Sequence, residues 1–117
     1  MEPDQSAIFA DQIGRELWVV VVRGEHDAAT APRIEAELQR IGATGTDIVV
    51  DLSEASFIDS SIARVLVEYV LYPPTGEAIA VVAPPETFPR RALSVLGLDT
   101  MLPTHDTRDD ALKALGR

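Results

Sequence analysis

The sequence has 117 residues, a hydrophobic fraction of 46% and a charged fraction of 25%, which fit one soluble globular domain with a modest core. Its formal net charge of −9 repels phosphate backbones and anionic lipid surfaces and favours a basic partner, so direct nucleic-acid binding is not expected. There is no cysteine, which excludes disulfides, zinc–thiolate sites and thiol catalysis.

The N-terminal part of the chain carries no recognisable targeting or membrane signal. Residues 1–5 are acidic and polar, lack the pattern of a signal peptide and are expected to be disordered. The longest apolar runs, such as residues 17–22, are far too short to span a bilayer, which takes about 20 residues. We therefore expect a cytoplasmic protein without membrane contact, folded over residues 6–117.

The first elements predicted are two strands that form an antiparallel hairpin at one side of a sheet. Residues 7–10 form a short strand, 11–14 a turn, and 17–22 give the strongest strand signal in the chain. Residues 23–27 are expected to leave this strand.

A helix is predicted next, over residues 28–41. Asp27 or Thr30 lies near its start, and Gly42 is suited to end it.

The stretch from Ile48 to Leu66 is the centre of the prediction. Ile48 to Leu52 is the β-branched run of a buried strand, and from Ile62 the apolar residues follow one face of a helix: Ile62, Val65, Leu66, Tyr69 and Val70. Between them, Asp59-Ser60-Ser61 has the side chains of a helix N-cap. Two serines at a strand-to-helix junction, at the positive end of a helix dipole, form the candidate functional site.

The remaining elements continue the alternation of strand and helix. The prolines at 73 and 74 end the central helix, and the elements that follow are a strand over 78–83, a helix over 86–96 closed by Gly97, a short strand over 100–103, and a helix over 108–115 capped by Asp106 or Thr107. This order predicts an α/β domain with a mixed, mostly parallel sheet of four to five strands. About four helices are expected, mainly on one face.

Three stretches resemble the STAS family, and within it the bacterial anti-sigma-factor antagonists. Residues 24–31 resemble the family's Gly-Glu-x-Asp-x-x-Thr segment, and residues 50–61 its Asp-Leu-x-x-Val-x-Phe-Ile-Asp-Ser-Ser/Thr signature. Residues 80–83 and 90–98 are similar to its later strand and the helix that ends in Gly-Leu. The resemblance spans roughly residues 7–115 and implies a STAS fold.

The resemblance also implies a function and a site. In the family, the serine after the signature aspartate is phosphorylated by an anti-sigma factor that is also a serine kinase; by position this is Ser60. The unphosphorylated form binds that partner and releases the sigma factor, and phosphorylation abolishes binding. A serine phosphatase is a further expected partner, and the protein is expected to be a monomer or a weak dimer. In place of the family's Gly-Leu-Gly, this chain has Ile62-Ala63-Arg64.

A partner-binding surface is expected around Ser60. If the central helix buries its apolar face, Val67 and Leu71 lie towards the other side as exposed aliphatics flanked by charge, which suits a reversible contact. The predicted partner-binding residues are Glu25, Asp27, Asp59, Ser61, Arg64, Val67, Glu68 and Leu71.

Several residues have simpler interpretations. For Ser60 the alternative is plain capping, Ser61 is expected to be structural, and Asp59 either caps the helix or orients the serine hydroxyl. His26, Asp27 and Ser60 could suggest a serine hydrolase, but no Gly-x-Ser-x-Gly elbow surrounds Ser60, so no catalytic residue is assigned. The other expected roles are a solvated helix face for Arg90-Arg91, an exposed loop for His105, the core for Trp18, and helix N-terminal charges for Asp106, Asp109 and Asp110.

No metal, cofactor or enzymatic activity is therefore predicted. No glycine-rich phosphate loop is present, so ATP would come with the kinase. The main alternative function is that of a STAS subunit in another assembly, such as a stressosome-like complex or a lipid-transport system.

Overall fold

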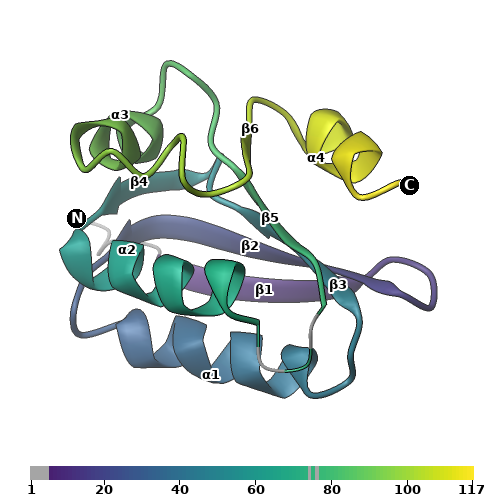
Figure 1. Cartoon of the computed structure of the whole chain (residues 1–117). Coiled ribbons are helices and arrows are strands. Elements are labelled where there is room, and N and C mark those ends of the chain that lie inside the picture. The colour runs from purple at the N-terminus through teal and green to yellow at the C-terminus, as the bar shows by residue number, and fades with distance from the viewer. Residues whose placement is uncertain (1–5, 74, 76) are drawn as a thin grey trace.

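The chain forms a mixed sheet covered by helices (Figure 1). The computed structural model describes residues 6–73, 75 and 77–117; the segment 1–5, predicted to be disordered, and part of the proline turn lie outside these residues. The strands are β1 (Ala7–Gln12), β2 (Leu17–His26), β3 (Asp47–Asp51), β4 (Ala55–Ile58), β5 (Ile79–Val82) and β6 (Thr104–His105). The helices are α1 (Ala31–Gly42), α2 (Ser60–Leu66), which continues as the π-helical turn η1 (Val67–Leu71), α3 (Phe88–Val95) and α4 (Arg108–Ala114).

The sheet confirms the predicted α/β class. Its strand order is β1-β2-β3-β5-β6, with β4 paired to β2 off this path. β1 and β2 form the antiparallel hairpin, and all other pairs are parallel. The sheet has six strands rather than four to five, because β4 was not predicted. The last strand lies at Thr104–His105 and not at 100–103, so His105 is a half-buried strand residue and the loop prediction for it is wrong.

The second strand is longer than predicted, and its extra length positions the candidate site. Residues 23–26 do not leave the sheet; they continue β2 and pair with β4. Gly24 has a φ of 84°, which glycine tolerates without steric cost, and the register shifts between Gly24 and Glu25. After this bulge, Glu25 pairs with Phe57 and His26 with Ile58.

Alternate side chains of the strands build two apolar layers, as a strand's two-residue period requires. Val20, Val22, Ile48, Val50 and Val81 belong to the larger core cluster, with residues of α1, α2, η1 and α3. The other sheet face is covered by α4, whose Ala111 packs with a smaller cluster: Leu17, Val19, Val21, Val49, Ala80 and Val82. Helices therefore contribute mainly to one core, with α4 on the opposite side (Figure 1).

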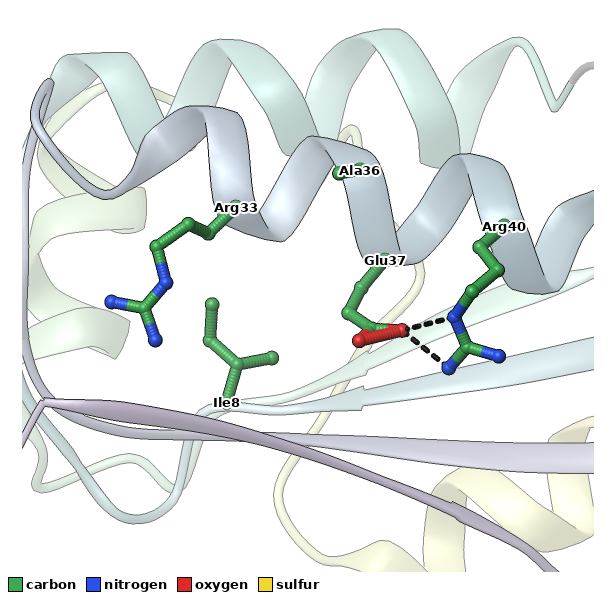
Figure 2. Close-up of a pocket in the computed structure, with 5 residues that line it drawn as sticks. All are labelled: Ile8, Arg33, Ala36, Glu37 and Arg40. Atoms are coloured by element: carbon green, nitrogen blue, oxygen red, sulfur yellow. Dashed lines mark hydrogen bonds and ion pairs between the residues drawn. The ribbon is translucent and has the colours of Figure 1, made fainter.

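The hairpin and α1 border a shallow hollow on the side of α1 that faces β1. It is lined by Ile8, Arg33, Ala36, Glu37 and Arg40 (Figure 2). The Arg40 Nε donates to Glu37 Oε1 at 2.8 Å, and its guanidinium lies 5.5 Å from the centroid of the Trp18 ring. Trp18 is half-buried and packs at the margin of the larger cluster rather than inside it. None of the predicted site residues borders this hollow.

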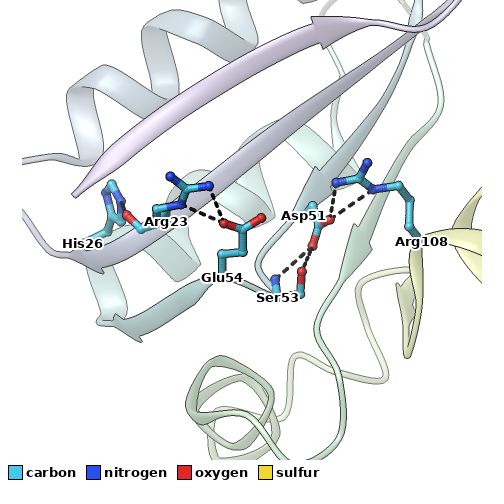
Figure 3. Close-up of polar contacts among 6 residues, drawn as sticks. All are labelled: Arg23, His26, Asp51, Ser53, Glu54 and Arg108. Atoms are coloured by element: carbon cyan, nitrogen blue, oxygen red, sulfur yellow. Dashed lines mark hydrogen bonds and ion pairs between the residues drawn. The ribbon is translucent and has the colours of Figure 1, made fainter. Parts of the chain in front are cut away.

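A buried carboxylate ties α4 to the central strands (Figure 3). Asp51 is 3% exposed; its Oδ1 accepts from the Ser53 N–H at 2.9 Å and the Ser53 hydroxyl at 2.6 Å, and its Oδ2 accepts from Arg108 Nη2 at 2.8 Å. The burial of Asp51 is therefore compensated by charge-assisted bonds. In the described part of the chain, no helix combines the length and apolar character needed to cross a bilayer.

Hydrogen bonds between side chains and the backbone lie at or just before the start of each α-helix. Asp27 Oδ1 accepts from the Ala29 N–H at 2.9 Å, and Thr30 Oγ1 accepts from the Asp27 N–H at 3.0 Å. These bonds hold residues 28–30 as a turn, so α1 begins at Ala31 and not at Ala28. Thr87 and Thr107 likewise cap α3 and α4.

Candidate functional site

The carboxyl ends of β2 and β4 meet at one edge of the sheet. His26 pairs with Ile58, so the residues that follow them, Asp27 and Asp59, leave the sheet side by side. Because the two strands are parallel, their ends bring together side chains that are about thirty positions apart in the sequence. The register thus leads the residues after β2 towards the start of α2, where Ala28 and Ser61 line one hollow.

Asp59 is the N-cap of α2. Its backbone is extended, with φ −117° and ψ −171°, and its Oδ1 accepts from the N–H groups of Ser61 at 2.9 Å and Ile62 at 3.3 Å. The capping role, one of the two that the sequence left open for Asp59, is thus observed. Ser61 is half-buried and its N–H is held by this cap.

Ser60 is the first residue of α2 and is exposed. Within residues 6–73, 75 and 77–117, no hydrogen bond occupies its hydroxyl, since the capping bonds come from Asp59 instead. The backbone of Ser60 is fixed by the cap on one side and the helix on the other, while the residue itself is exposed. A reagent or enzyme in solution can therefore reach this oxygen.

An apolar groove of about 330 Å³ lies between the β4–α2 junction and α3. We call it the α3 groove; it is lined by Ile58, Asp59, Ser60, Phe88, Arg91, Ala92, Val95 and Leu96. The Phe57 and Phe88 rings stack at its margin with their centroids 5.2 Å apart, which joins β4 to α3. Val95 is 86% exposed and Leu96 50%, so large aliphatic side chains meet water directly beside Ser60.

The α3 groove was missed at the sequence level. The only available signal was that Phe88 and Val95 fall away from the core face that Leu93 marks. Leu96, the C-cap three positions after Leu93, gave no such signal, although half of it is exposed. Only the pairing of β4 shows that α3 borders the serine.

A second hollow, of about 360 Å³, lies on the other side of the serines, between α1 and α2. We call it the α1–α2 hollow; it is lined by Ala28, Ala31, Pro32, Glu35, Ser61, Arg64, Val65 and Glu68. It brings together three of the predicted partner-binding residues, Ser61, Arg64 and Glu68, and adds Glu35 from α1. Charges of both signs line this hollow, and its lining holds fewer large apolar side chains than that of the α3 groove.

The expected exposure of Val67 and Leu71 is wrong. Both are half-buried and pack against the larger core cluster. They belong to η1, and the wider π-helical turn shifts side chains around the axis relative to an α-helix. Ile62, Val65, Leu66, Tyr69 and Val70 are buried as predicted. The exposed aliphatics beside the serine are thus supplied by α3 and not by the outer face of η1.

Tyr69 joins η1 to α1 behind the site. Its hydroxyl accepts from Gln39 Nε2 at 2.6 Å and donates to Glu35 Oε2 at 3.1 Å. Burial of the side chain raises the pKa of Tyr69 above its usual value of 10.0, and the nearby Glu35 carboxylate adds to the increase. The phenol therefore stays neutral and fixes the position of Glu35 at the α1–α2 hollow.

His26 is not positioned to activate Ser60. The ring is fully buried, and its Nε2 lies 2.7 Å from the carbonyl oxygen of Arg23 (Figure 3). Its Nδ1 lies 3.1 Å from Thr30 Oγ1. Both ring nitrogens are thus engaged within the segment that leads from β2 to α1. A hydrolase triad needs one of them on the nucleophile, so this arrangement argues against that alternative.

The two neighbouring arginines of α3 differ. Arg90 Nη1 donates to the Ala83 carbonyl at 2.7 Å and to Asp106 Oδ1 at 2.9 Å, so the solvated position expected for Arg90 is wrong. Arg91 is exposed and borders the α3 groove. Among the described residues, no three histidine or acidic side chains are grouped so as to hold a metal ion.

Comparison with known proteins gives concordant matches. The family model described as "Mlab, STAS domain" matches residues 9–103. The crystal structure of an anti-sigma factor antagonist from Mycobacterium paratuberculosis is 31% identical, with a TM-score of 0.85 over 99% of this chain and 98% of that one. No curated protein sequence matches.

Two more distant structures share the fold. The anti-sigma factor antagonist SpoIIAA in its unphosphorylated form is 20% identical, with a TM-score of 0.73 over 93% of this chain and 96% of that one. The phosphorylated form of SpoIIAA, a Bacillus cell fate determinant, is also 20% identical, with a TM-score of 0.67 over 93% of this chain and 99% of that one.

Proposed function

The chain belongs to the STAS family, and from this premise we propose that it is an anti-sigma-factor antagonist that is switched by phosphorylation of Ser60. In its unphosphorylated form it binds an anti-sigma factor with serine kinase activity and thereby releases a sigma factor. Phosphorylation disables that binding, and a serine phosphatase restores it. The observation that carries this proposal is the exposed Ser60 hydroxyl, which no described residue engages, at the border of an exposed apolar groove.

The exposure of Ser60 suits phosphoryl transfer from a separate kinase. The serine oxygen attacks the γ-phosphorus of ATP, the bond from that phosphorus to the β–γ bridging oxygen breaks, ADP leaves, and the hydroxyl proton passes to a base of the kinase. In this chain, Asp59 fixes the backbone of the acceptor residue. The kinase supplies the nucleotide and the catalytic groups.

The α3 groove is suited to anchor the anti-sigma factor. Val95 and Leu96 present an apolar centre beside a neutral hydroxyl, and interfaces commonly combine such a centre with a polar rim. Asp27 and Asp59, together with the net charge of −9, favour a partner whose own docking surface is basic.

Phosphorylation changes this surface without requiring a change of fold. The phosphoryl group adds about −1.5 to −2 charges at neutral pH. An unpaired charge that is desolvated at an interface costs about 2–5 kcal/mol. Since each 1.4 kcal/mol corresponds to a factor of ten, we expect affinity to fall by roughly 30-fold to a few thousand-fold.

The test compares the binding of wild type, Ser60→Ala and Ser60→Asp to a kinase-type anti-sigma factor from the same organism by calorimetry. We expect the alanine variant to bind and the aspartate variant to bind at least about tenfold more weakly. Ser94→Asp is the matched control, because it adds the same charge at an exposed serine of α3 that does not line the groove. Equal affinities of the alanine and aspartate variants would remove Ser60 from the mechanism.

A second candidate is a STAS subunit of a different assembly. The matching family model carries the description Mlab, whereas the similar crystal structure is that of an anti-sigma factor antagonist. Co-purification from the native organism separates the two. A small kinase-type anti-sigma factor supports the proposal, and a stable complex with membrane transport proteins supports the alternative.

A further inference from the structure

The exposed arginines next to Ser60 are free of ion pairs, unlike most arginines in this chain. Arg23, Arg40, Arg90, Arg108 and Arg117 each pair with a carboxylate. Across the described residues, no such pair forms at Arg64 or Arg91, and both side chains are exposed. Arg15 and Arg33 also lack an ion pair among the described residues, so what distinguishes Arg64 and Arg91 is that they lie near the same serine.

The two arginines reach the serine from different elements. Arg91, on α3, lines the α3 groove together with Ser60 and Asp59. Arg64 lies four positions after Ser60 in the same helix, a spacing that places two side chains next to each other on the helix surface. It also lines the hollow on the opposite side, with Ser61. Arg64 and Arg91 therefore flank the Ser60 hydroxyl from its two sides.

We propose that Arg64 and Arg91 form an intramolecular clamp that holds the phosphoryl group of phosphorylated Ser60. The inference rests on the proposed modification of Ser60. A guanidinium presents paired N–H donors that match two phosphate oxygens, and such charge-assisted bonds are among the strongest in proteins. Two guanidinium groups supply two positive charges, which match the charge of a phosphate dianion.

Neighbouring carboxylates repel the phosphate and compete with it for the guanidinium groups. Asp59 is next to the modified residue, but its Oδ1 already accepts two backbone N–H groups. Glu35 and Glu68 line the same hollow as Arg64 and compete for its guanidinium. Neither holds Arg64 in an ion pair in the unmodified protein, so Arg64 can turn to a phosphate without breaking an existing bond.

The clamp gives phosphorylation a second effect on the partner. In the unmodified protein, Arg64 and Arg91 are available for individual carboxylates on an anti-sigma factor surface that is basic overall. After phosphorylation they turn to the phosphate, so the partner loses two cationic contacts at the moment when it meets a bulky anion. The same contacts offset the repulsion between the phosphate and Asp59, which lets the fold tolerate the modification.

The experiment uses the full chain with phosphoserine installed at position 60 during translation, and follows the phosphate by ³¹P NMR as a function of pH. Nearby cations favour the dianion, so the second pKa of the phosphate is expected to be lower in the wild type than in Arg64→Gln or Arg91→Gln, by about half a unit or more for each. The double variant is expected to show the largest increase. Arg33→Gln is the matched control, because Arg33 is an exposed arginine that borders the separate hollow next to β1 (Figure 2).

Equal second pKa values of the phosphate in the wild type and the double variant would overturn the clamp. A change in this pKa with only one of the two arginines would overturn the proposal that both hold the phosphate. Thermal unfolding of each unmodified variant verifies that the fold is intact. Because no partner is present, this result is independent of the proposed function. If the pKa of the phosphate does not depend on the arginines, the clamp is wrong but the proposed Ser60 switch is unaffected. If phosphorylation does not change partner binding, the switch is wrong, and the clamp can still be tested by the phosphate pKa.

Discussion

The Asp59 side chain offers a way to separate capping from participation in phosphorylation. Its Oδ1 accepts from two N–H groups of the first turn of α2, at 2.9 and 3.3 Å. Asparagine caps helices about as well as aspartate and has the same shape, whereas alanine cannot accept these bonds. Asp59→Asn therefore removes the charge and keeps the cap, and Asp59→Ala removes both.

The expected magnitudes follow from this geometry. Loss of an N-cap costs about 0.5–2 kcal/mol. Because one of the two capping bonds is long, we expect Asp59→Ala to cost about 1 kcal/mol. For a domain of 117 residues this lowers the melting temperature by about 3–6 °C. Asp59→Asn should stay within about 0.5 kcal/mol of the wild type. Urea denaturation followed by circular dichroism measures both differences.

The same pair of variants tests the second role that the sequence left open for Asp59. If Asp59 only caps the helix, the asparagine variant is phosphorylated by the kinase at the wild-type rate, as measured by mass spectrometry. A large loss of rate in a stably folded asparagine variant would instead show that the carboxylate acts on the hydroxyl. Equal stabilities of the alanine and asparagine variants would refute the capping argument itself.

Three further predictions address the groove, the buried ion pair and the buried phenol. Val95→Asp should leave stability within about 0.5 kcal/mol, because Val95 is 86% exposed, yet weaken partner binding at least about tenfold in calorimetry; unchanged affinity would exclude the α3 groove from the interface. Arg108→Gln should lower the free energy of unfolding, measured in urea, by about 1–3 kcal/mol, because Asp51 stays buried while it loses its cation, although Arg108 itself is partly exposed. The control is Lys113→Gln, an exposed site on the same helix without an ion pair among the described residues, and an equal cost for the two variants would contradict the prediction. Because the pKa of Tyr69 is raised in the folded state, its neutral phenol contributes stability that is fully present below pH 10 and is lost above it, since the unfolded chain ionises its phenol first. Tyr69→Phe should therefore show less loss of stability at alkaline pH in urea titrations from pH 9 upward, and a pH profile identical to the wild type would argue against the buried phenol.

Most of the fold could be predicted from local patterns, and the failures share a cause. The apolar run from Leu17 to Val22 predicts β2, and the apolar spacing from Ile62 onward predicts the central helix, in each case from the local sequence alone. The strand β4 (Ala55–Ile58) could not be predicted in this way. Its first and last residues are buried and the two between them are exposed, so it lacks the two-residue alternation that marks a strand. Gly24 resembled the end of β2, although its positive φ serves a bulge within that strand.

The sequence suggested the centre of the candidate site but not the residues at its margins. Ser60 and Asp59 belong to one contiguous signature, so the sequence alone identifies them. The neighbours Phe88, Val95 and Arg91 come from a helix about thirty positions later, and a single sequence does not show that α3 packs beside β4. The Asp51–Arg108 pair, 57 positions apart, is invisible for the same reason.

The elements around Ser60 combine a rigid frame with movable charges, and this combination determines what kind of switch is possible. The frame consists of the Asp59 cap, the pairing of β4 with β2 and the Phe57–Phe88 stack, none of which involves the hydroxyl. The switch that we propose therefore needs no interconversion between two folds, because phosphorylation of Ser60 would alter only an exposed side chain. If Ser60 is phosphorylated as we propose, the added charge acts mainly on the docking surface, and we expect the partner's affinity to change while the stability of the domain does not.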